Sequence, residues 1–357
     1  MVHLWVRAEQ RPNEERVGIT PEGAAALIAR GFSVTIEQSP RRALSIKPYL
    51  TAGCTAAPYG SWPQAPREAI IFGLKELPED GTPLIHRHIL FGHAYKGQPA
   101  GKLLLERFRA GGGVLFDLES LTDEAGRRVA AFGYWAGYAG AAVAVKCWAA
   151  QARGRICGPL ARYHDRAALL ADLAGDLDAA LAGGADRPEA LVIGALGRVG
   201  SGAADLCEAL DLPVTRWDMA ETAHGGPFPE VLAHAIFLNC ILARPGCPVF
   251  VPASALTAPR ALRVIGDIAC DPGSDFSPIK VYDRVTDWAE PALRVHDDPV
   301  LDVTAIDNLP SLLPIESSQD YAAQLLPHLA SLDTLDSAQE DGVWARARAE
   351  FARHIAD

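Results

Sequence analysis

Acid/base side chains lie close together in two short segments of the first third of the chain. Lys75 and Glu76 follow the apolar run Ile70–Gly73, and the glutamate could hold the lysine ammonium or moderate its pKa. His93 stands in the second segment, and an imidazole titrates near neutral pH. Lys75 and His93 are therefore candidate proton carriers, although a lysine after a strand is more commonly only solvated.

Three histidines, His86, His88 and His93, raise the question of a metal site. Their spacing fits no standard zinc pattern, and no cysteine or paired acidic ligand accompanies them. We therefore expect no metal here, and acid/base use of one histidine is the better interpretation.

Arginines in the same region could hold an acidic substrate. Arg16, Arg127 and Arg128 are the candidates, because a guanidinium group binds a carboxylate through two parallel hydrogen bonds. Adjacent arginines are more often surface charge, and only the apolar stretch 129–132 that follows favours a binding role for this pair. Several such groups indicate a substrate with more than one carboxylate.

A glycine-rich turn indicates a dinucleotide site. Gly194, Gly197 and Gly200 lie between the apolar run Ala190–Ile193 and a helical pattern, where glycines allow backbone amides to approach a pyrophosphate. Asp218 lies 18 residues after Gly200, where a carboxylate can bind ribose hydroxyls and favours NAD over NADP. Because the spacing is not the standard G-x-G-x-x-G, a glycine turn that serves only for packing remains an alternative. Arg198 and Arg216 lie nearby and weaken the preference for NAD over NADP.

Short apolar runs that alternate with helical patterns predict an α/β fold with mostly parallel sheets. Val129–Val145 is free of charge for 17 residues, which is short for a membrane span and predicts a buried helix. Strands are expected over Val2–Val6, Phe32–Glu37, Ile70–Gly73, Val114–Asp117, Ala190–Ile193, Val214–Asp218, Ala235–Ile241, Pro248–Val251, Arg263–Asp267 and Val303–Ile306. Helices are expected over Pro21–Arg30, Gly101–Ala110, Tyr134–Gln151, Ala167–Leu181, Ser317–Ser331 and Ser337–Ile355.

Length and composition limit the class of protein. A chain of 357 residues is long enough for two domains of roughly 150 residues. Its net charge of −11 argues against a general nucleic-acid binder and against a protein held on anionic lipid. Seven cysteines without a C-x-x-C pair predict neither a disulfide framework nor a structural zinc site. With no signal-peptide pattern at Met1–Arg7, we expect a cytoplasmic protein.

Motifs in order along nearly the whole chain carry a family resemblance. Residues 7–21, with Arg7-Ala-Glu9 and Glu15-Arg16-Val-Gly-Ile-Thr-Pro21, resemble the opening of the alanine dehydrogenase and transhydrogenase superfamily. More specific motifs resemble the lysine-forming saccharopine dehydrogenases. These are Gly73-Leu-Lys75-Glu76-Leu-Pro78, His93-Ala-Tyr-Lys96, Gly126-Arg-Arg-Val-Ala-Ala-Phe132-Gly133, Gly194-Ala-Leu-Gly-Arg198 with Trp217-Asp218, Gly225-Gly-Pro-Phe228 and Ile306-Asp307-Asn-Leu-Pro-Ser-Leu-Leu-Pro314.

The resemblance implies two Rossmann-like lobes with mostly parallel sheets and an active-site cleft between them. Residues 1–133 plus 315–357 would form the substrate and catalytic domain, and 134–314 the dinucleotide-binding domain. The family cleaves saccharopine with NAD and water to L-lysine and 2-oxoglutarate, reversibly. By similarity, Lys75 takes a proton from the secondary amine, and His93 manages protons as water attacks the imine.

The resemblance also implies roles for further residues. Substrate-binding positions are Arg16, Gln98, Arg127, Arg128 and Phe132, and carboxylates that tune the site are Glu76 and Glu119. Cofactor-binding positions are Arg198, Asp218, Thr222, Ile268, Asp307 and Leu309, in addition to the three glycines.

Two alternatives remain at this point. A related opine-type or alanine dehydrogenase-like enzyme would act on a different amine. A non-catalytic NAD-binding regulatory relative is less favoured, because Lys75 and His93 are both present. Small molecules are the expected partners, with neither nucleic acid nor membrane, and the sequence leaves the oligomeric state open.

Overall fold

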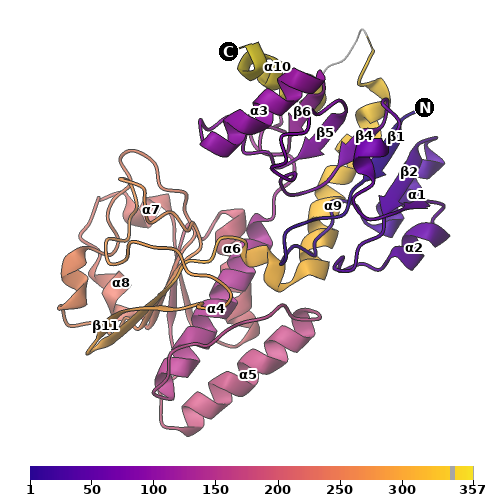
Figure 1. Cartoon of the computed structure of the whole chain (residues 1–357). Helices are drawn as coiled ribbons and strands as arrows, with labels where there is room; N and C mark the ends of the chain where they lie inside the picture. The colour runs from indigo at the N-terminus through magenta and orange to yellow at the C-terminus, as the bar shows by residue number, and fades with distance from the viewer. Residues whose placement is uncertain (338–341, 357) are drawn as a thin grey trace. The chain divides into compact units, whose positions relative to one another are not determined.

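The computed structural model describes residues 1–337 and 342–356, and these form two compact units (Figure 1). The first unit combines Met1–Ala131 with Pro314–Asp357, so it is built from both ends of the chain. The second unit is the continuous segment Phe132–Leu313. Phe132, expected from the resemblance to serve the substrate domain, belongs to the second unit.

The first unit holds a six-stranded, entirely parallel sheet in the order β3-β2-β1-β4-β5-β6. This is the strand order of a doubly wound dinucleotide fold, whose chain reverses direction across the sheet between its first and fourth strands. The loops that follow β1 and β4 therefore leave the carboxyl edge of the sheet in opposite directions. The strands are β1 (His3–Val6), β2 (Ser33–Glu37), β3 (Thr55–Ala57), β4 (Ile70–Phe72), β5 (Arg87–Leu90) and β6 (Val114–Asp117).

Helices from both ends of the chain cover this sheet. The C-terminal helix α10 packs against β6 and α3 (Figure 1). In this contact the rings of Phe108 and Phe351 lie edge to face, with their centroids 5.6 Å apart. Helix α1 begins at Pro21, where the Thr20 side chain accepts a hydrogen bond from the Gly23 amide. The helices are α1 (Pro21–Ala29), α2 (Ile46–Thr51), α3 (Pro99–Gly111), α9 (Pro314–Ala330) and α10 (Val343–Ala356), with 3-10 turns η1 (Trp62–Gln64) and η4 (Ser331–Thr334).

The second unit holds another six-stranded sheet, in the order β11-β12-β10-β9-β7-β8. Its strands are parallel except at the edge, where β11 pairs antiparallel to β12. The strands are β7 (Ala190–Ile193), β8 (Val214–Trp217), β9 (Ile236–Asn239), β10 (Val264–Asp267), β11 (Leu293–Asp297) and β12 (Val300–Thr304). The helices are α4 (Gly133–Ala152), α5 (Arg166–Ala182), α6 (Arg198–Ala209), α7 (Met219–Thr222) and α8 (Pro229–Ala233), with η2 (Ala253–Leu256) and η3 (Leu309–Leu312).

Small residues bring α4 and α6 into close contact. A Cβ atom on Gly137 would lie 1.8 Å from the carbonyl oxygen of Val199, and one on Gly202 would lie 1.9 Å from that of Tyr134. Only glycine fits at such distances, because the two helix backbones themselves touch. This contact explains why α4 is rich in glycine and alanine and buried over most of its length.

The α/β class with two mostly parallel sheets is confirmed. Pro248–Val251, predicted as a strand, is wrong: it is a loop with one bridge from Val251 to Ile279. The sequence also missed the short strands β3, β5 and β11. Within the predicted helix Ser337–Ile355, residues 338–341 lie outside the described residues, and α10 begins at Val343.

The uncharged stretch from Val129 is largely the buried helix α4, as predicted. Across residues 1–337 and 342–356, no helix is long and apolar enough to cross a membrane.

The α4–α6 contact predicts a sharp difference between two glycine substitutions. Gly202→Ala forces a methyl group into the Tyr134 carbonyl, so we expect the free energy of unfolding to fall by about 1–3 kcal/mol or more. Gly175→Ala, on the exposed face of α5, meets open space and should raise stability by up to ~1 kcal/mol. Urea unfolding measures both, and equal effects would contradict the packing argument.

Candidate active site

The candidate acid/base residues follow neighbouring strands at one edge of the first sheet. Lys75 lies after β4, His93 after β5 and Glu119 after β6. Because β4, β5 and β6 are parallel neighbours, their carboxyl ends meet at the same edge. The loop after β1, which contains Arg16, leaves this edge as well.

A carboxylate from the β1 loop fixes the backbone at Lys75. Glu9 accepts hydrogen bonds from the Leu74 amide at 2.7 Å and the Lys75 amide at 3.0 Å. The buried Arg7 guanidinium donates to the Lys75 carbonyl and lies 3.4 Å from Glu9. Residues that follow the neighbouring strand β1 thus bind the peptide groups on both sides of Lys75. The backbone is fixed, and only the Lys75 side chain can change its conformation.

Burial and the neighbouring Arg16 favour the neutral form of Lys75. Burial lowers the pKa of the Lys75 ammonium, and the positive charge of Arg16 lowers it further, while Glu14 opposes them. Arg16 and Glu14 form a buried pair with two contacts of 2.6 and 2.8 Å. Burial opposes ionisation of Glu14, but Arg16 and Lys75 still hold the pKa of Glu14 below its ordinary value. A lysine in this setting is suited to accept a proton.

His93 lies in a constrained loop. Its backbone φ is 47°, in the left-handed region, and the buried Asp117 accepts hydrogen bonds from the amides on both sides, Gly92 and Ala94, at 3.3 Å each. The His93 Nδ1 atom lies 3.2 Å from Glu119. With Nδ1 engaged, Nε2 is the nitrogen left for proton exchange, because no other described residue contacts it through a hydrogen bond.

Glu119 sets the charge of this loop. Its hydrogen bond to His93, aided by one from Lys96, holds the pKa of Glu119 at about 2. In return, Glu119 raises the pKa of His93, against the opposing effects of burial and of Lys96. Glu119 therefore stabilises the imidazolium that forms when His93 takes up a proton, whereas the surroundings of Lys75 disfavour its charged form.

The other candidate residues of the first unit are less enclosed. Glu76 pairs with Arg11 at 2.8 Å, and Gln98 is the exposed residue that precedes α3. Arg127 is 80% exposed and pairs with Asp123, a surface ion pair of the kind that contributes little to stability, and Arg128 is also exposed. Such arginines give up little interaction energy when their side chains turn toward an anionic ligand.

His86 directly precedes β5 and His88 lies within it, and both side chains are buried in the core of the first unit. The ring of His86 lies 3.1 Å from the Ala65 carbonyl through Nε2, and burial lowers the pKa of His88 well below its ordinary value. In the parts of the chain that the structure describes, no three His, Cys, Asp or Glu side chains are grouped to hold a metal ion.

In the second unit, the glycine turn connects β7 to α6. Gly194 has φ +90°, and a Cβ on Gly200 would lie 2.1 Å from the Gly194 carbonyl oxygen. Gly197 is the exposed residue that caps the start of α6. The first turn of α6 therefore begins at an exposed glycine, and the start of a helix behind such a turn fits a bound pyrophosphate.

Asp218 directly follows β8 and lies beside this turn. Its carboxylate accepts hydrogen bonds from the amides of Leu196 and Met219 at 3.0 and 2.9 Å, and Glu221 completes a capping box. The Thr222 hydroxyl donates to the Asp218 carbonyl at 3.0 Å. Asp218 is thus held at the position where a carboxylate can meet ribose hydroxyls.

The remaining candidates follow the adjacent strands. Ile268 comes after β10, and Asp307 and Leu309 come after β12, all at the carboxyl edge of the second sheet. Asp307 is exposed, but the Leu309 side chain is only 4% exposed and packs into the core. Only the backbone of Leu309 could contact a ligand. Together these residues fit a dinucleotide.

Sequence reasoning missed the residues that hold these loops, namely Arg7, Glu9, Glu14 and Asp117. Each is a charged side chain that is buried at the carboxyl edge of the first sheet. A charged residue directly after an apolar strand was the available signal for Arg7 and Asp117.

Comparison with known proteins extends over almost the whole chain. A saccharopine dehydrogenase (NAD+, L-lysine-forming) of Candida glabrata is 44% identical over 99% of this chain and 97% of its own length. The Candida albicans enzyme of the same name is 43% identical over 99% and 97%.

More distant similarity follows the fold. Residues 5–139 match the family model of the alanine dehydrogenase/PNT N-terminal domain. A solved L-alanine dehydrogenase superposes with a TM-score of 0.68, at 17% identity, over 99% of this chain and 94% of that chain. At this identity the likeness concerns the fold alone.

The His93–Glu119 contact predicts a titration shift. Glu119→Gln removes the charge that raises the pKa of His93, and leaves burial and Lys96, which lower it. We therefore expect the imidazole pKa to fall, as followed by NMR of the His93 ring against pH. Glu124→Gln, at an exposed position in the nearby turn, is the control and should leave the titration unchanged. An unchanged pKa in Glu119→Gln would refute the coupling.

Proposed function

The chain belongs to the family of NAD-dependent, L-lysine-forming saccharopine dehydrogenases, and from this membership we propose its reaction. The protein cleaves saccharopine with NAD+ and water to L-lysine and 2-oxoglutarate, with release of NADH and a proton, and the reaction is reversible.

The observation that carries this proposal is the opposite bias of two proton carriers at one sheet edge. Lys75, whose pKa is lowered, and His93, whose pKa is raised, follow the adjacent strands β4 and β5. Oxidation of an amine needs a base, and hydrolysis of the resulting imine needs a group that exchanges protons with water. One residue of each kind supports this pair of steps.

Lys75 serves as the base for the first step. Bound NAD+ would supply the acceptor for the hydride that leaves the glutaryl Cα of saccharopine. The neutral Nζ of Lys75 takes the proton from the secondary amine, so that a carbon–nitrogen double bond remains. Glu9 and Arg7 hold the Lys75 backbone, and the nearby Arg16 favours its neutral form.

His93 serves the second step. Its neutral Nε2 accepts a proton from the water that attacks the imine carbon, while Glu119 stabilises the imidazolium through Nδ1. The same proton is then available to the amine that leaves as lysine. Because Glu119 raises the pKa of His93, the imidazolium is stabilised at the stage where it forms.

Arginines hold the carboxylates of the substrate. Arg16, Arg127 and Arg128, with Gln98 and Phe132, bind saccharopine, and Glu76 and Glu119 balance the positive charge. Arg16 is already oriented by Glu14 through two contacts, which supports a fixed role in binding.

The second unit binds the cofactor. The turn that contains Gly194, Gly197 and Gly200, together with Arg198, would hold the pyrophosphate at the start of α6, and Asp218 with Thr222 would hold the adenosine ribose. Ile268, Asp307 and the backbone of Leu309 would complete the cofactor site. A carboxylate at position 218 disfavours a 2′-phosphate, which supports NAD over NADP.

We further propose that the protein acts in the cytoplasm on small molecules. All seven cysteines are free, which fits a reducing compartment.

A substrate comparison tests the proposed function. We expect oxidation of NADH, followed by absorbance, with 2-oxoglutarate and L-lysine together, and much slower oxidation when ornithine replaces lysine. The same reaction with NADPH should be slower. Turnover with pyruvate and ammonia, or with another amine but not lysine, would instead assign an alanine or opine-type dehydrogenase. No turnover with any pair would favour a non-catalytic relative.

Replacement of the proton carriers gives the second test. Lys75→Met and His93→Gln should each lower kcat/KM by about 10²–10⁴-fold. In the oxidative direction kcat/KM should rise with pH until the lowered pKa of Lys75 is passed, and this rise should vanish in Lys75→Met. Lys47→Met, at an exposed position on α2, is the control. An unchanged pH profile in Lys75→Met would overturn the assignment of the base.

A further inference from the structure

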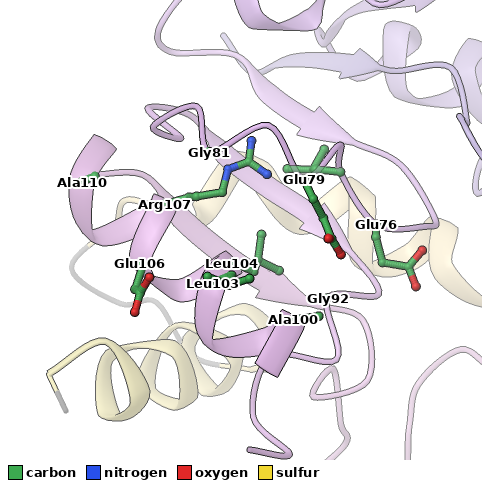
Figure 2. A pocket seen from close by; sticks show the side chains of 11 residues that line it. Glu76, Glu79, Gly81, Gly92, Ala100, Leu103, Leu104, Glu106, Arg107 and Ala110 are labelled. Atoms are coloured by element: carbon green, nitrogen blue, oxygen red, sulfur yellow. The ribbon is translucent and has the colours of Figure 1, made fainter. Parts of the chain in front are cut away.

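A preformed pocket of about 400 Å³ lies in the first unit between α3 and the loop of residues 76–81 (Figure 2). We call it the α3 pocket. Neither Lys75 nor His93 lines it. Its wall is mainly aliphatic, with Leu77 from the loop and Leu103 and Leu104 from the helix. Its volume is in the range of sites that bind small organic molecules.

The loop above the pocket is fixed to the helix by one side chain. The Arg107 guanidinium on α3 donates to the carbonyl oxygens of Pro78 and Thr82 at 2.5 and 2.8 Å, and pairs with Asp80 at 2.9 Å. Pro78 and Asp80 belong to the loop, and Thr82 directly follows it. The pocket therefore keeps its shape without a ligand, so little ordering is needed for binding.

The charge of the pocket is unbalanced. Arg107 is the one cation among its lining residues, and its charge is already taken up by Asp80. Three glutamates also line it, of which Glu76 pairs with Arg11. Within residues 1–337 and 342–356, Glu79 and Glu106 have neither an ion-pair nor a side-chain hydrogen-bond partner. Figure 2 shows Glu79 extending from the loop toward α3.

We propose that the α3 pocket is a binding site for an aliphatic primary ammonium, with a chain of about four to six carbons on the leucines and the cation at the glutamates. The apolar wall removes the chain from water, which contributes ~0.8 kcal/mol for each buried methylene group. The carboxylate of Glu79 accepts hydrogen bonds from the ammonium, and charge-assisted bonds of this kind are among the strongest.

The lining excludes other ligand classes. An anion would meet unpaired carboxylates and no free cation. A quaternary ammonium is normally held by aromatic rings, and no aromatic side chain lines this pocket. A neutral hydrocarbon would make no favourable contact with Glu79 and Glu106, which are exposed to water.

The α3 pocket is separate from the proposed reaction but adjoins its loop. Glu76, at the edge of the pocket, directly follows Lys75. Binding of an ammonium needs neither cofactor nor turnover, so it can be measured whether or not the protein proves to be a saccharopine dehydrogenase.

The test uses n-pentylamine hydrochloride and the full chain with labelled leucine methyl groups. We expect saturable NMR shifts at the methyls of Leu77, Leu103 and Leu104. Glu79→Gln should weaken binding by about tenfold, because one charge-assisted hydrogen bond is lost. Glu68→Gln, an exposed glutamate outside the pocket, is the matched control and should bind as the parent does.

Two further arms make the proposal refutable. n-Pentanol has the same chain without the charge, and equal binding of pentanol and pentylamine would overturn the role of the carboxylates. Sedimentation of the parent chain and of Leu103→Asp tests the competing occupant, a second copy of the chain. A dimer that dissociates in Leu103→Asp, with no amine binding by the parent, would assign the α3 pocket to a subunit contact and refute the proposal.

Discussion

The first unit depends on carboxylates that bind backbone amides of neighbouring loops. Glu9 receives the amides of Leu74 and Lys75, and Asp117 receives those of Gly92 and Ala94. A parallel sheet aligns its loops at one edge but does not fix their backbone. Glu9 joins the β1 and β4 loops, and Asp117 joins the β5 loop to the end of β6. The Phe91 amide donates to the Leu74 carbonyl at 2.9 Å and connects these two pairs. The side chains of Lys75 and His93 project from a backbone that is already held.

The sequence predicted the parts of the site that carry recognisable chemistry. Lys75, His93 and the glycine turn combine a reactive residue type with an apolar run nearby, and that pattern is local. Glu9 is 65 residues from its partner Leu74, and Asp117 is 23 residues from Ala94. Such bonds exist only after the sheet has formed, so no window of the sequence contains them. The roles of Glu9 and Asp117 therefore had to come from the structure.

The same division holds for the fold. The alternation of strands and helices was predictable because the central strands are apolar. Strand β5 was missed because His86 and Arg87-His88 interrupt the apolar pattern, although His88 is fully buried among aromatic rings. The run Pro248–Val251 was misread because prolines at 248 and 252 restrict pairing, and the Phe250 and Val251 amides both bond to the Pro278 carbonyl instead.

The discontinuous first unit has a consequence for synthesis on the ribosome. Strands β1–β6 emerge first, but α9 and α10, which complete their core through contacts such as Phe108–Phe351, emerge only after residue 314. The second unit is continuous from 132 to 313 and has every residue of its core before then. Its folding can precede that of the first unit, which reverses the usual order in which domains fold from the N-terminus. Until α10 emerges, the face of β6 that it covers stays uncovered.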